Sequence, residues 1–170
     1  MSLRVDRVSG VQGLARAHAL RWEVFVTEQG VLAAEELDGR DELPGTVHLV
    51  AVDTTGQDVG TARLLADPDR PGVVHVTRVA VSSTARGRGV GRALMADAER
   101  IALAEYATGT PPSVRVELSA QESAIAFYAA LGYDIGAERY LDARIWHRDA
   151  VRTLPVAAAA AEPGGPPARP

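Results

Sequence analysis

The sequence has no cysteine among its 170 residues, which excludes disulfides, thiolate nucleophiles and cysteine-based metal sites. It has no apolar run long enough to span a bilayer and no basic-then-apolar leader, so we expect a cytoplasmic protein. The four histidines are scattered without the spacing of metal ligands, and we expect no metal. A net charge of −4 argues against general binding to nucleic acid.

The remaining composition is that of one globular domain with a terminal extension. Apolar residues make up 46% of the chain, which is ordinary for a globular protein and sufficient for a sizeable core. We expect the domain to span residues 1–152. Residues 153–170 are rich in alanine, proline and glycine and have little to bury, so we predict a disordered tail.

Hydrophobic periodicity predicts alternating strands and helices. Alternation and β-branched runs indicate strands at 3–8, 46–53, 59–66, 73–81, 113–119, 133–139 and 143–151. Apolar residues at helical spacing indicate helices at 11–28, 89–105 and 123–131. This order predicts a single α/β (α+β) domain, with a mixed central sheet of six to seven strands and flanking helices.

A turn rich in glycine and arginine, RGRGVG at 86–91, follows the strand at 73–81 and opens the helix at 89–105. The N–H groups of such a turn and the dipole of the helix favour an anion. The turn matches neither the G-x-x-x-x-G-K-[ST] pattern nor the G-x-G-x-x-G pattern. It is a candidate diphosphate site, and the alternative is a plain strand-to-helix connector.

Two longer segments, in the right order, resemble the motifs of a known superfamily. VTRVAVSSTARGRGVGRALMADAE resembles motif A of the GCN5-related N-acetyltransferase (GNAT) superfamily, and QESAIAFYAALGY resembles its motif B. RWEVFVTEQGV, EELDGRDE and YLDARIWHR are similar to the ElaA/YjcF-like branch. Three residues depart from these patterns on the acceptor side, namely Gln121, Arg144 and Trp146. The resemblance therefore defines the GNAT fold and the acyl donor better than the acceptor.

The resemblance implies that the turn binds the pyrophosphate of acetyl-coenzyme A, mostly through the backbone N–H groups of 87–91. The resemblance also implies that the main chain of Val79 and Val81 pairs with the pantetheine arm, which lies against β-strand 73–81 like an added strand. The residues thus assigned to the cofactor are Val79, Ala80, Val81, Arg86, Gly87, Arg88, Gly89, Val90, Gly91, Arg92, Gln121, Ala124, Phe127 and Tyr128.

The resemblance also implies direct attack of an amine on the thioester in a ternary complex, with the Val79 N–H facing the oxyanion. Tyr128 matches the tyrosine of the family pattern F-Y-x-x-x-G-[FY] and is the candidate acid for the departing thiolate. The base remains open. His75 alternates with Thr77, Val79 and Val81 on one strand face and falls where some members carry a strand glutamate. The other candidates are the carboxylates of the acidic segment, beginning with Glu28, which closes the first helix on the acceptor side. A relay of the proton through water also stays open.

Acidic residues gather in the segment 28–42. Carboxylates attract a cationic amine, which favours an acceptor site there, and the alternative is a solvated acidic face. His147 and Asp142 reach the same pocket from the terminal strands in this interpretation. The acceptor-binding candidates are Glu28, Gln29, Glu36, Asp38 and His147.

The leading hypothesis is an acetyl-CoA-dependent N-acetyltransferase acting on a primary amine of a small molecule or peptide. A protein lysine or N-terminal acetyltransferase is a close alternative, and a non-catalytic acyl-CoA-binding sensor is an alternative of another class. Oligomers are frequent in the superfamily, so the resemblance suggests a homodimer. No nucleic acid or membrane partner is expected.

Overall fold

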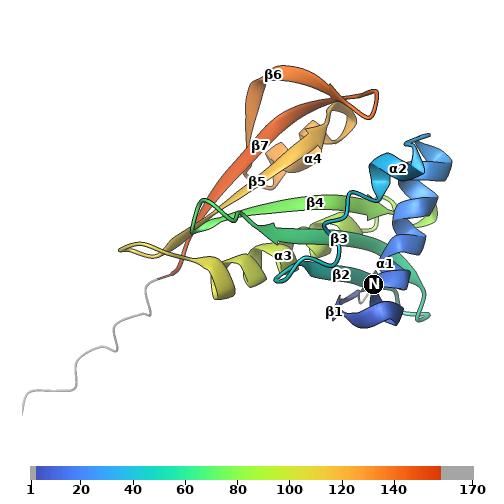
Figure 1. The fold of residues 1–170 in the computed structure, drawn as a ribbon, viewed down its shortest axis with the longest axis horizontal. Coiled ribbons are helices and arrows are strands. Elements are labelled where there is room, and N and C mark those ends of the chain that lie inside the picture. The colour runs from blue at the N-terminus through green and yellow to red at the C-terminus, as the bar shows by residue number, and fades with distance from the viewer. Residues whose placement is uncertain (1–2, 158–170) are drawn as a thin grey trace, which may run out of the picture.

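The computed structural model describes residues 3–157 and arranges them around one mixed sheet (Figure 1). Its seven strands are β1 (Arg4–Val8), β2 (Val47–Val52), β3 (Asp58–Ala66), β4 (Val73–Val81), β5 (Ser113–Gln121), β6 (Asp134–Asp142) and β7 (Ile145–Pro155). They lie in the order β1-β2-β3-β4-β5-β7-β6. All neighbours are antiparallel except β4 and β5, which are parallel. The predicted fold class and strand number are confirmed.

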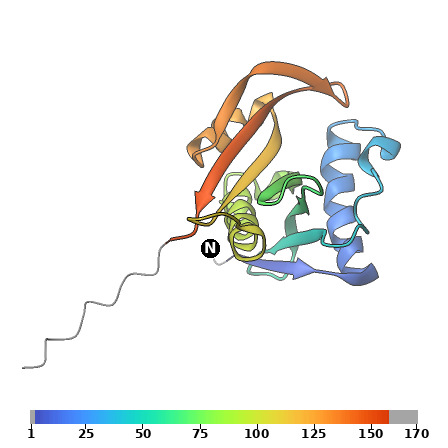
Figure 2. The ribbon, with the colours of Figure 1, turned by 60° about the vertical axis from the view of Figure 1, so that its left-hand side comes forward.

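Helices cover both faces of the sheet (Figure 2). They are α1 (Gly10–Arg21), the π-helix η1 (Trp22–Glu28), α2 (Ala33–Glu36), the 3₁₀ turn η2 (Ser83–Ala85), α3 (Val90–Tyr106), the 3₁₀ turn η3 (Glu122–Ala124) and α4 (Ile125–Ala130). The segment 11–28 was predicted as one helix, but after α1 it continues as the wider π-helix η1. There the Gln29 N–H donates to the Val24 carbonyl, five residues back, at 3.1 Å. Such π turns are frequent at functional sites.

Two apolar clusters attach the helices to the sheet. On one face, α3 buries the stripe that its periodicity predicts: Val90, Leu94, Met95, Ala98, Ile101 and Ala102. On the other face, Ala17 and Leu20 of α1 pack against Val50 and Val52 of β2. A Cβ at Gly60 of β3 would lie 2.7 Å from the Val90 side chain, so glycine lets the start of α3 approach the sheet closely. The helix N-terminus is thereby held at the end of β4.

The last strand continues beyond the expected end of the domain. β7 runs to Pro155, and Leu154 is buried and pairs with Val114 of β5. The remainder of the predicted disordered tail, from residue 158 on, lies outside the described residues. Of the helices within 3–157, none is long and apolar enough to cross a membrane.

Candidate active site

Strands β4 and β5 separate halfway along their length. They pair only between Val73–His75 and Arg115–Glu117. Beyond that point lie a groove of about 590 Å³ and a cavity of about 480 Å³. The two hollows share four lining residues, Gln29, Val79, Ala124 and Tyr128. They therefore meet at the point where the strands diverge.

We call the first hollow the turn groove and the second the side cavity. Besides the shared residues, the turn groove is lined by Val24, Glu28, Ala80, Val81, Ala85, Arg86, Gly87, Gly89, Val90, Gly91, Arg92, Ser123 and Phe127. The side cavity is lined by Phe25, Val31, Glu35, Glu36, Asp38, Arg40, Arg63, Val76, Thr77, Arg78, Ser119, Gln121, Asp142, Ala143, Ile145 and His147.

A bulge in β4 separates the two hollows. Thr77 faces Arg63 of β3, whereas Ala80 faces Thr61, so β4 holds one residue more than its partner. Arg78, at this bulge, has a left-handed φ of 55°. The extra residue reverses the alternation of side chains. We expected His75, Thr77, Val79 and Val81 on one face, and this was wrong: Val79 and Val81 pack on the α3 cluster.

The turn groove is built largely from backbone at the start of α3. Gly87 and Gly89 have left-handed φ angles of 75° and 82°, which glycine adopts without strain. A Cβ on either would meet no atom within 4 Å, whereas one on Gly91 would lie 3.1 Å from the Phe127 ring. The first two glycines therefore serve the turn conformation, and the third serves the packing of α3 against α4.

The three arginines of the turn differ in position. Arg86 and Arg92 line the turn groove, but Arg88 does not. Arg86 forms an ion pair with Glu28 at 2.6 Å, and the hydrogen bond from Arg86 lowers the pKa of Glu28. Glu28 thus lies in the turn groove as the partner of an arginine. It does not line the side cavity, where we expected it to bind or deprotonate the acceptor.

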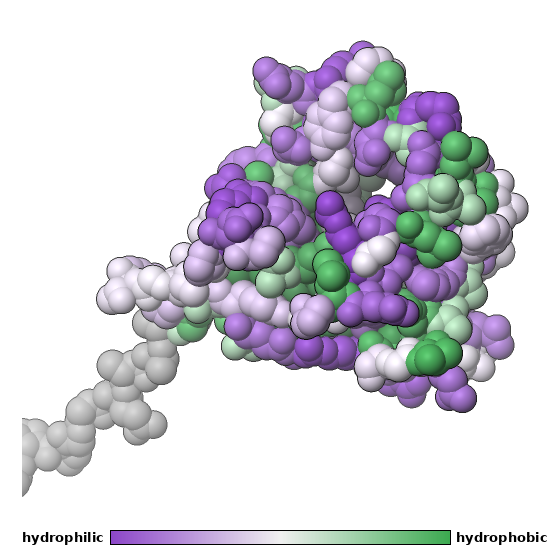
Figure 3. Space-filling view, in the orientation of Figure 1, coloured by the Kyte–Doolittle hydropathy of each residue, from purple (hydrophilic) through white to green (hydrophobic). Residues whose placement is uncertain are grey.

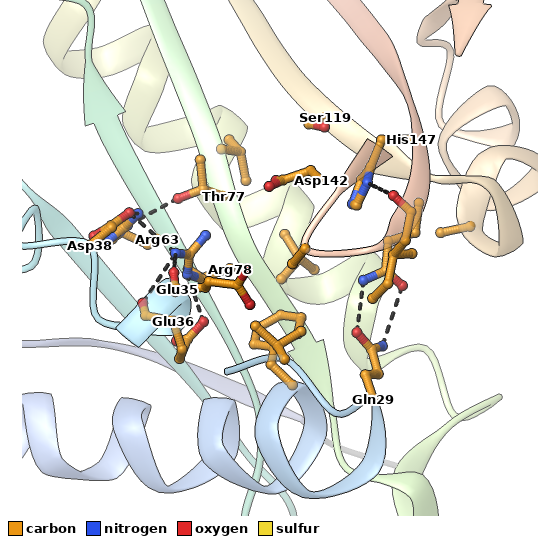
Figure 4. Close-up of a pocket in the computed structure, with 18 of the residues that line it drawn as sticks. Gln29, Glu35, Glu36, Asp38, Arg63, Thr77, Arg78, Ser119, Asp142 and His147 are labelled. Atoms are coloured by element: carbon orange, nitrogen blue, oxygen red, sulfur yellow. Dashed lines mark hydrogen bonds and ion pairs between the residues drawn. The ribbon is translucent and has the colours of Figure 1, made fainter. Parts of the chain in front are cut away.

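The side cavity is bordered by a partly buried network of three arginines and three carboxylates, and Figure 4 labels Arg63, Arg78, Glu36 and Asp38 of this network. The network consists of Arg21, Arg63, Arg78, Glu36, Asp38 and Asp41. Arg63 donates to Asp38 at 2.6 Å and 2.8 Å and to Thr77 at 3.0 Å. The Arg78 Nε lies 2.9 Å from a Glu36 carboxylate oxygen. The predicted acceptor carboxylates Glu36 and Asp38 therefore already have arginine partners.

This network holds its carboxylates in the charged form. Burial alone would raise the pKa of Asp38, but hydrogen bonds from Arg63 lower it to about 2. Burial opposes the charge of Asp41 in the same way, and hydrogen bonds from Arg21, His18 and Arg63 nevertheless hold its pKa well below the ordinary range. Carboxylates in this state are weak bases, so they are unsuited to taking a proton from an amine.

Two predicted residues from different regions form a bridge where the hollows meet. The amide groups of Gln29 and Gln121 exchange hydrogen bonds at 2.8 Å and 3.3 Å. The resemblance assigns Gln121 to cofactor binding, but the residue lines the side cavity rather than the turn groove.

A second bridge runs from Arg144, between β6 and β7, to Glu35 and to the Gly30 carbonyl. The space-filling view shows the hollow between this hairpin and α2 surrounded by hydrophilic residues (Figure 3).

Tyr128 is the aromatic residue that belongs to both hollows. Its ring is buried and packs edge-on against Phe127 and Tyr133, with ring centroids 5.0 Å and 5.8 Å away. Burial raises the pKa of Tyr128 to about 12. The phenol therefore keeps its proton at neutral pH and can act as a donor.

His75 lies outside both hollows. It sits on the stretch of β4 that is still paired with β5, and its Nε2 lies 2.9 Å from Asp67. Alternation along the strand suggested a catalytic position for His75, but alternation alone does not show where β4 and β5 separate. We therefore withdraw the assignment of His75 as the base.

Sequence reasoning missed several residues of the side cavity. It assigned no role to Arg63, Thr77 or Ser119. The signal for Arg63 was its place in VGTARLLA, because a charged residue in a buried strand needs partners of opposite charge. His147 does reach the cavity, as predicted, and so does Asp142. Among residues 3–157, no group of acidic, histidine or cysteine side chains could hold a metal.

The family model of the acetyltransferase (GNAT) family matches residues 14–133 of this chain. The chain belongs to the GNAT acetyltransferase family. It is 34% identical to the uncharacterized N-acetyltransferase YjcF of Bacillus subtilis, over 79% of this chain and 88% of that relative. The predicted superfamily and enzyme class are confirmed.

Solved structures support the same placement of this GNAT chain. An acyl-CoA N-acyltransferase from Pseudomonas aeruginosa is 33% identical, with a TM-score of 0.73 over 89% of this chain and 98% of that chain. Escherichia coli ElaA is 27% identical, with a TM-score of 0.74 and the same coverage. Together with the likeness to YjcF, this confirms the ElaA/YjcF-like branch.

Proposed function

We propose that this GNAT protein transfers the acetyl group of acetyl-CoA to a primary amine of a small molecule or peptide, by direct attack in a ternary complex. One observation carries the proposal: a groove suited to a phosphorylated donor and a polar cavity meet at Tyr128 and Val79. The thioester would lie at this junction. The donor then enters from one side and the acceptor from the other.

The turn groove fits the donor in two respects. The left-handed glycines direct the turn into the N-terminus of α3, a helix of 17 residues, whose N–H groups and dipole attract a pyrophosphate. The pairing of β4 with β5 ends at His75, which leaves that side of β4 accessible around Val79 and Val81. The amides of a pantetheine arm would pair there as an added strand.

The side cavity suits a compact polar acceptor. Its volume of about 480 Å³ lies within the range of small-molecule sites. Its arginines and most of its carboxylates neutralise each other, so the cavity does not demand a strongly charged ligand. Shape and hydrogen bonding would therefore select the amine more than net charge.

The chemistry needs these surfaces, a proton donor and a proton acceptor. The amine nitrogen attacks the thioester carbonyl carbon, so a C–N bond forms and the C–S bond breaks. The nitrogen loses one proton to the acceptor, the departing thiolate takes a proton from the Tyr128 phenol, and exchange with solvent restores the phenol. The Val79 N–H stabilises the developing oxyanion. The chain has no cysteine, so no cysteinyl acyl-enzyme is formed.

Thiol release from acetyl-CoA tests the proposal. The amines offered are spermidine, tyramine, an amino-acid methyl ester and a short peptide with a free N-terminus and one lysine. The protein has neither cysteine nor lysine, so thiol background and self-acetylation at lysine are absent. We expect release that depends on the amine. Tyr128→Phe should lower kcat about 10²-fold while the Kd for acetyl-CoA stays unchanged.

Tyr106→Phe is the matched control, because the Tyr106 hydroxyl donates to the Gly45 carbonyl and lines neither hollow. An unchanged kcat in Tyr128→Phe would remove Tyr128 as the acid. Binding of acetyl-CoA without release to any amine would favour the sensor module.

A further inference from the structure

His147 of β7 is held next to the junction of the two hollows. It pairs with Gln121 of β5 on one side and with Tyr140 of β6 on the other. The residue is only 7% exposed, yet it lines the side cavity. Strands on both sides therefore fix its backbone, and the ring lies at the side cavity (Figure 4).

The orientation of the imidazole ring determines which nitrogen is basic. The Nδ1 atom lies 2.9 Å from the Ile145 carbonyl oxygen. A carbonyl only accepts, so Nδ1 carries the proton and Nε2 of the neutral ring carries a lone pair. The Tyr140 ring stacks on the imidazole, with centroids 6.1 Å apart and planes 19° apart. Within 3–157, no side chain or backbone group forms a hydrogen bond with Nε2.

The other candidate bases of the side cavity are engaged elsewhere. Glu36 is paired with arginines, and Asp38 is paired with Arg63. Glu35 accepts from the Leu32 N–H and from Arg144. These carboxylates therefore already have partners, either in the arginine network or in the bridge from Arg144.

Asp142 is the exception among the carboxylates that line the side cavity. Within the described part of the chain it forms no ion pair with an arginine. It pairs with Ile145, two residues before His147 on β7, and its carboxylate points toward Thr77 in Figure 4. An exposed carboxylate in this position would attract an ammonium group and bring it to the imidazole.

We propose that His147 is the general base of the reaction and that Asp142 binds the acceptor in its ammonium form; this rests on the proposed N-acetyl transfer. The Nε2 atom takes one proton from the bound ammonium, which frees the nitrogen lone pair, and passes this proton to solvent. It takes a second proton from the nitrogen as the C–N bond forms. The C–S bond breaks, and the thiolate takes the Tyr128 proton. Solvent then removes the second proton from His147 and returns one to Tyr128, so the net reaction consumes the ammonium form of the acceptor and acetyl-CoA and yields amide, CoA thiol and one proton.

The test compares His147→Ala and His147→Gln with His75→Ala, using whichever of spermidine, tyramine, the ester and the peptide releases thiol fastest. His75 is the matched control because it lies outside both hollows. We expect kcat to fall about 10²- to 10⁴-fold in both His147 variants, with the Kd for acetyl-CoA unchanged. Added imidazole should restore part of kcat in His147→Ala, and it should not change that of His75→Ala. Asp142→Asn should raise KM more than it lowers kcat.

Three results would overturn the inference. The first is a wild-type kcat in His147→Gln. The second is a loss in His147→Ala that imidazole does not restore, which would mean a structural role. The third needs no acceptor: nitrogen NMR of histidine-labelled protein should show His147 protonated on Nδ1, and a proton on Nε2 would contradict the assignment. If wild type acetylates none of the four amines, the proposed function fails, and the inference fails with it.

Discussion

The turn groove and the side cavity lie side by side but are built in different ways. The groove comes mainly from two short stretches, 79–92 and 123–128, and the groups proposed to bind the donor are backbone N–H groups at a helix N-terminus. The side cavity takes side chains from segments as far apart as Phe25 and His147. A site made of backbone and local turns leaves a contiguous sequence motif, whereas a site made of distant side chains does not.

The two hollows also differ in how their charges are compensated. In the groove, the Arg86–Glu28 pair is nearly half exposed. Beside the cavity, Arg21 and Arg63 are each 1% exposed and share Asp41. Water screens the exposed Arg86–Glu28 pair. The buried Arg21 and Arg63 instead depend on their carboxylate partners, because water is excluded from them. Substitutions should therefore affect ligand binding in the groove and folding in the cavity.

The largest effect is expected for Arg63→Met. It removes the buried guanidinium that pairs with Asp38 and Asp41, which should cost about 3–5 kcal/mol of unfolding free energy. Urea unfolding measures it, with Arg4→Met as control. The Arg4 side chain is 72% exposed, so its loss should change stability by less than about 0.5 kcal/mol. Equal effects of the two substitutions would show that the buried network is not structural.

Gly89→Glu should weaken acetyl-CoA binding at least about 10²-fold. A left-handed backbone strains any other residue by about 1–3 kcal/mol, and the new carboxylate would repel the pyrophosphate. Isothermal titration calorimetry gives the Kd. Gly109→Glu is the control, because Gly109 has a φ of 91° but lines neither hollow. If Gly89→Glu binds as tightly as wild type, the turn is not the phosphate site.

Acid should weaken the network around Asp38. Its pKa lies at about 2, below its ordinary 3.8, so the folded state favours the charged form. The resulting stabilisation is complete above about pH 5 and is lost as the pH falls through about 2. Because the Asp38 side chain is partly exposed to solvent, this stabilisation amounts to about 1 kcal/mol. The stability difference between wild type and Asp38→Asn should shrink by that amount over this range. An exposed-site control, Asp69→Asn, should show no such change.

The smallest effect is expected for Glu28→Gln. Glu28 is an exposed partner of Arg86 and does not line the side cavity, so kcat with any accepted amine should change by less than about twofold. Steady-state kinetics with the four amines measures it. A loss of 10²-fold or more would restore Glu28 as the base and undermine the role of His147.

Much of the fold was predictable because its signals are local. β-branched runs indicated all seven strands, and the spacing of Val90, Leu94 and Ala98 indicated the buried face of α3. The bulge at Arg78 was not predictable, because no turn residue marks it and it appears only in the pairing with β3. That one extra residue puts Thr77 and Val79 on opposite faces of β4. The prediction that His75 shares a face with Val79 was therefore wrong.

The predicted site residues also fall into two groups, those marked by local motifs and those whose contacts come from distant strands. The turn glycines and Tyr128 line the turn groove, and each could be located in advance because it belongs to a short motif, while their roles stay predictions. The partners of Glu36 and Asp38 could not be located in advance, because Arg63 and Arg78 reach them from other strands. Acidic residues close in sequence suggested a site for a cation, and the folded chain supplies most of that positive charge itself.

The sequence by itself determined the fold class, the glycine turn before α3 and the family, since strand propensity, glycine conformation and helix N-termini act over a few residues. Only the tertiary structure decided which charges are neutralised, that β4 and β5 separate after His75, and that His75 lies outside both hollows. These depend on contacts between residues distant in the chain. Such contacts depend on strand register and burial, which no local pattern encodes.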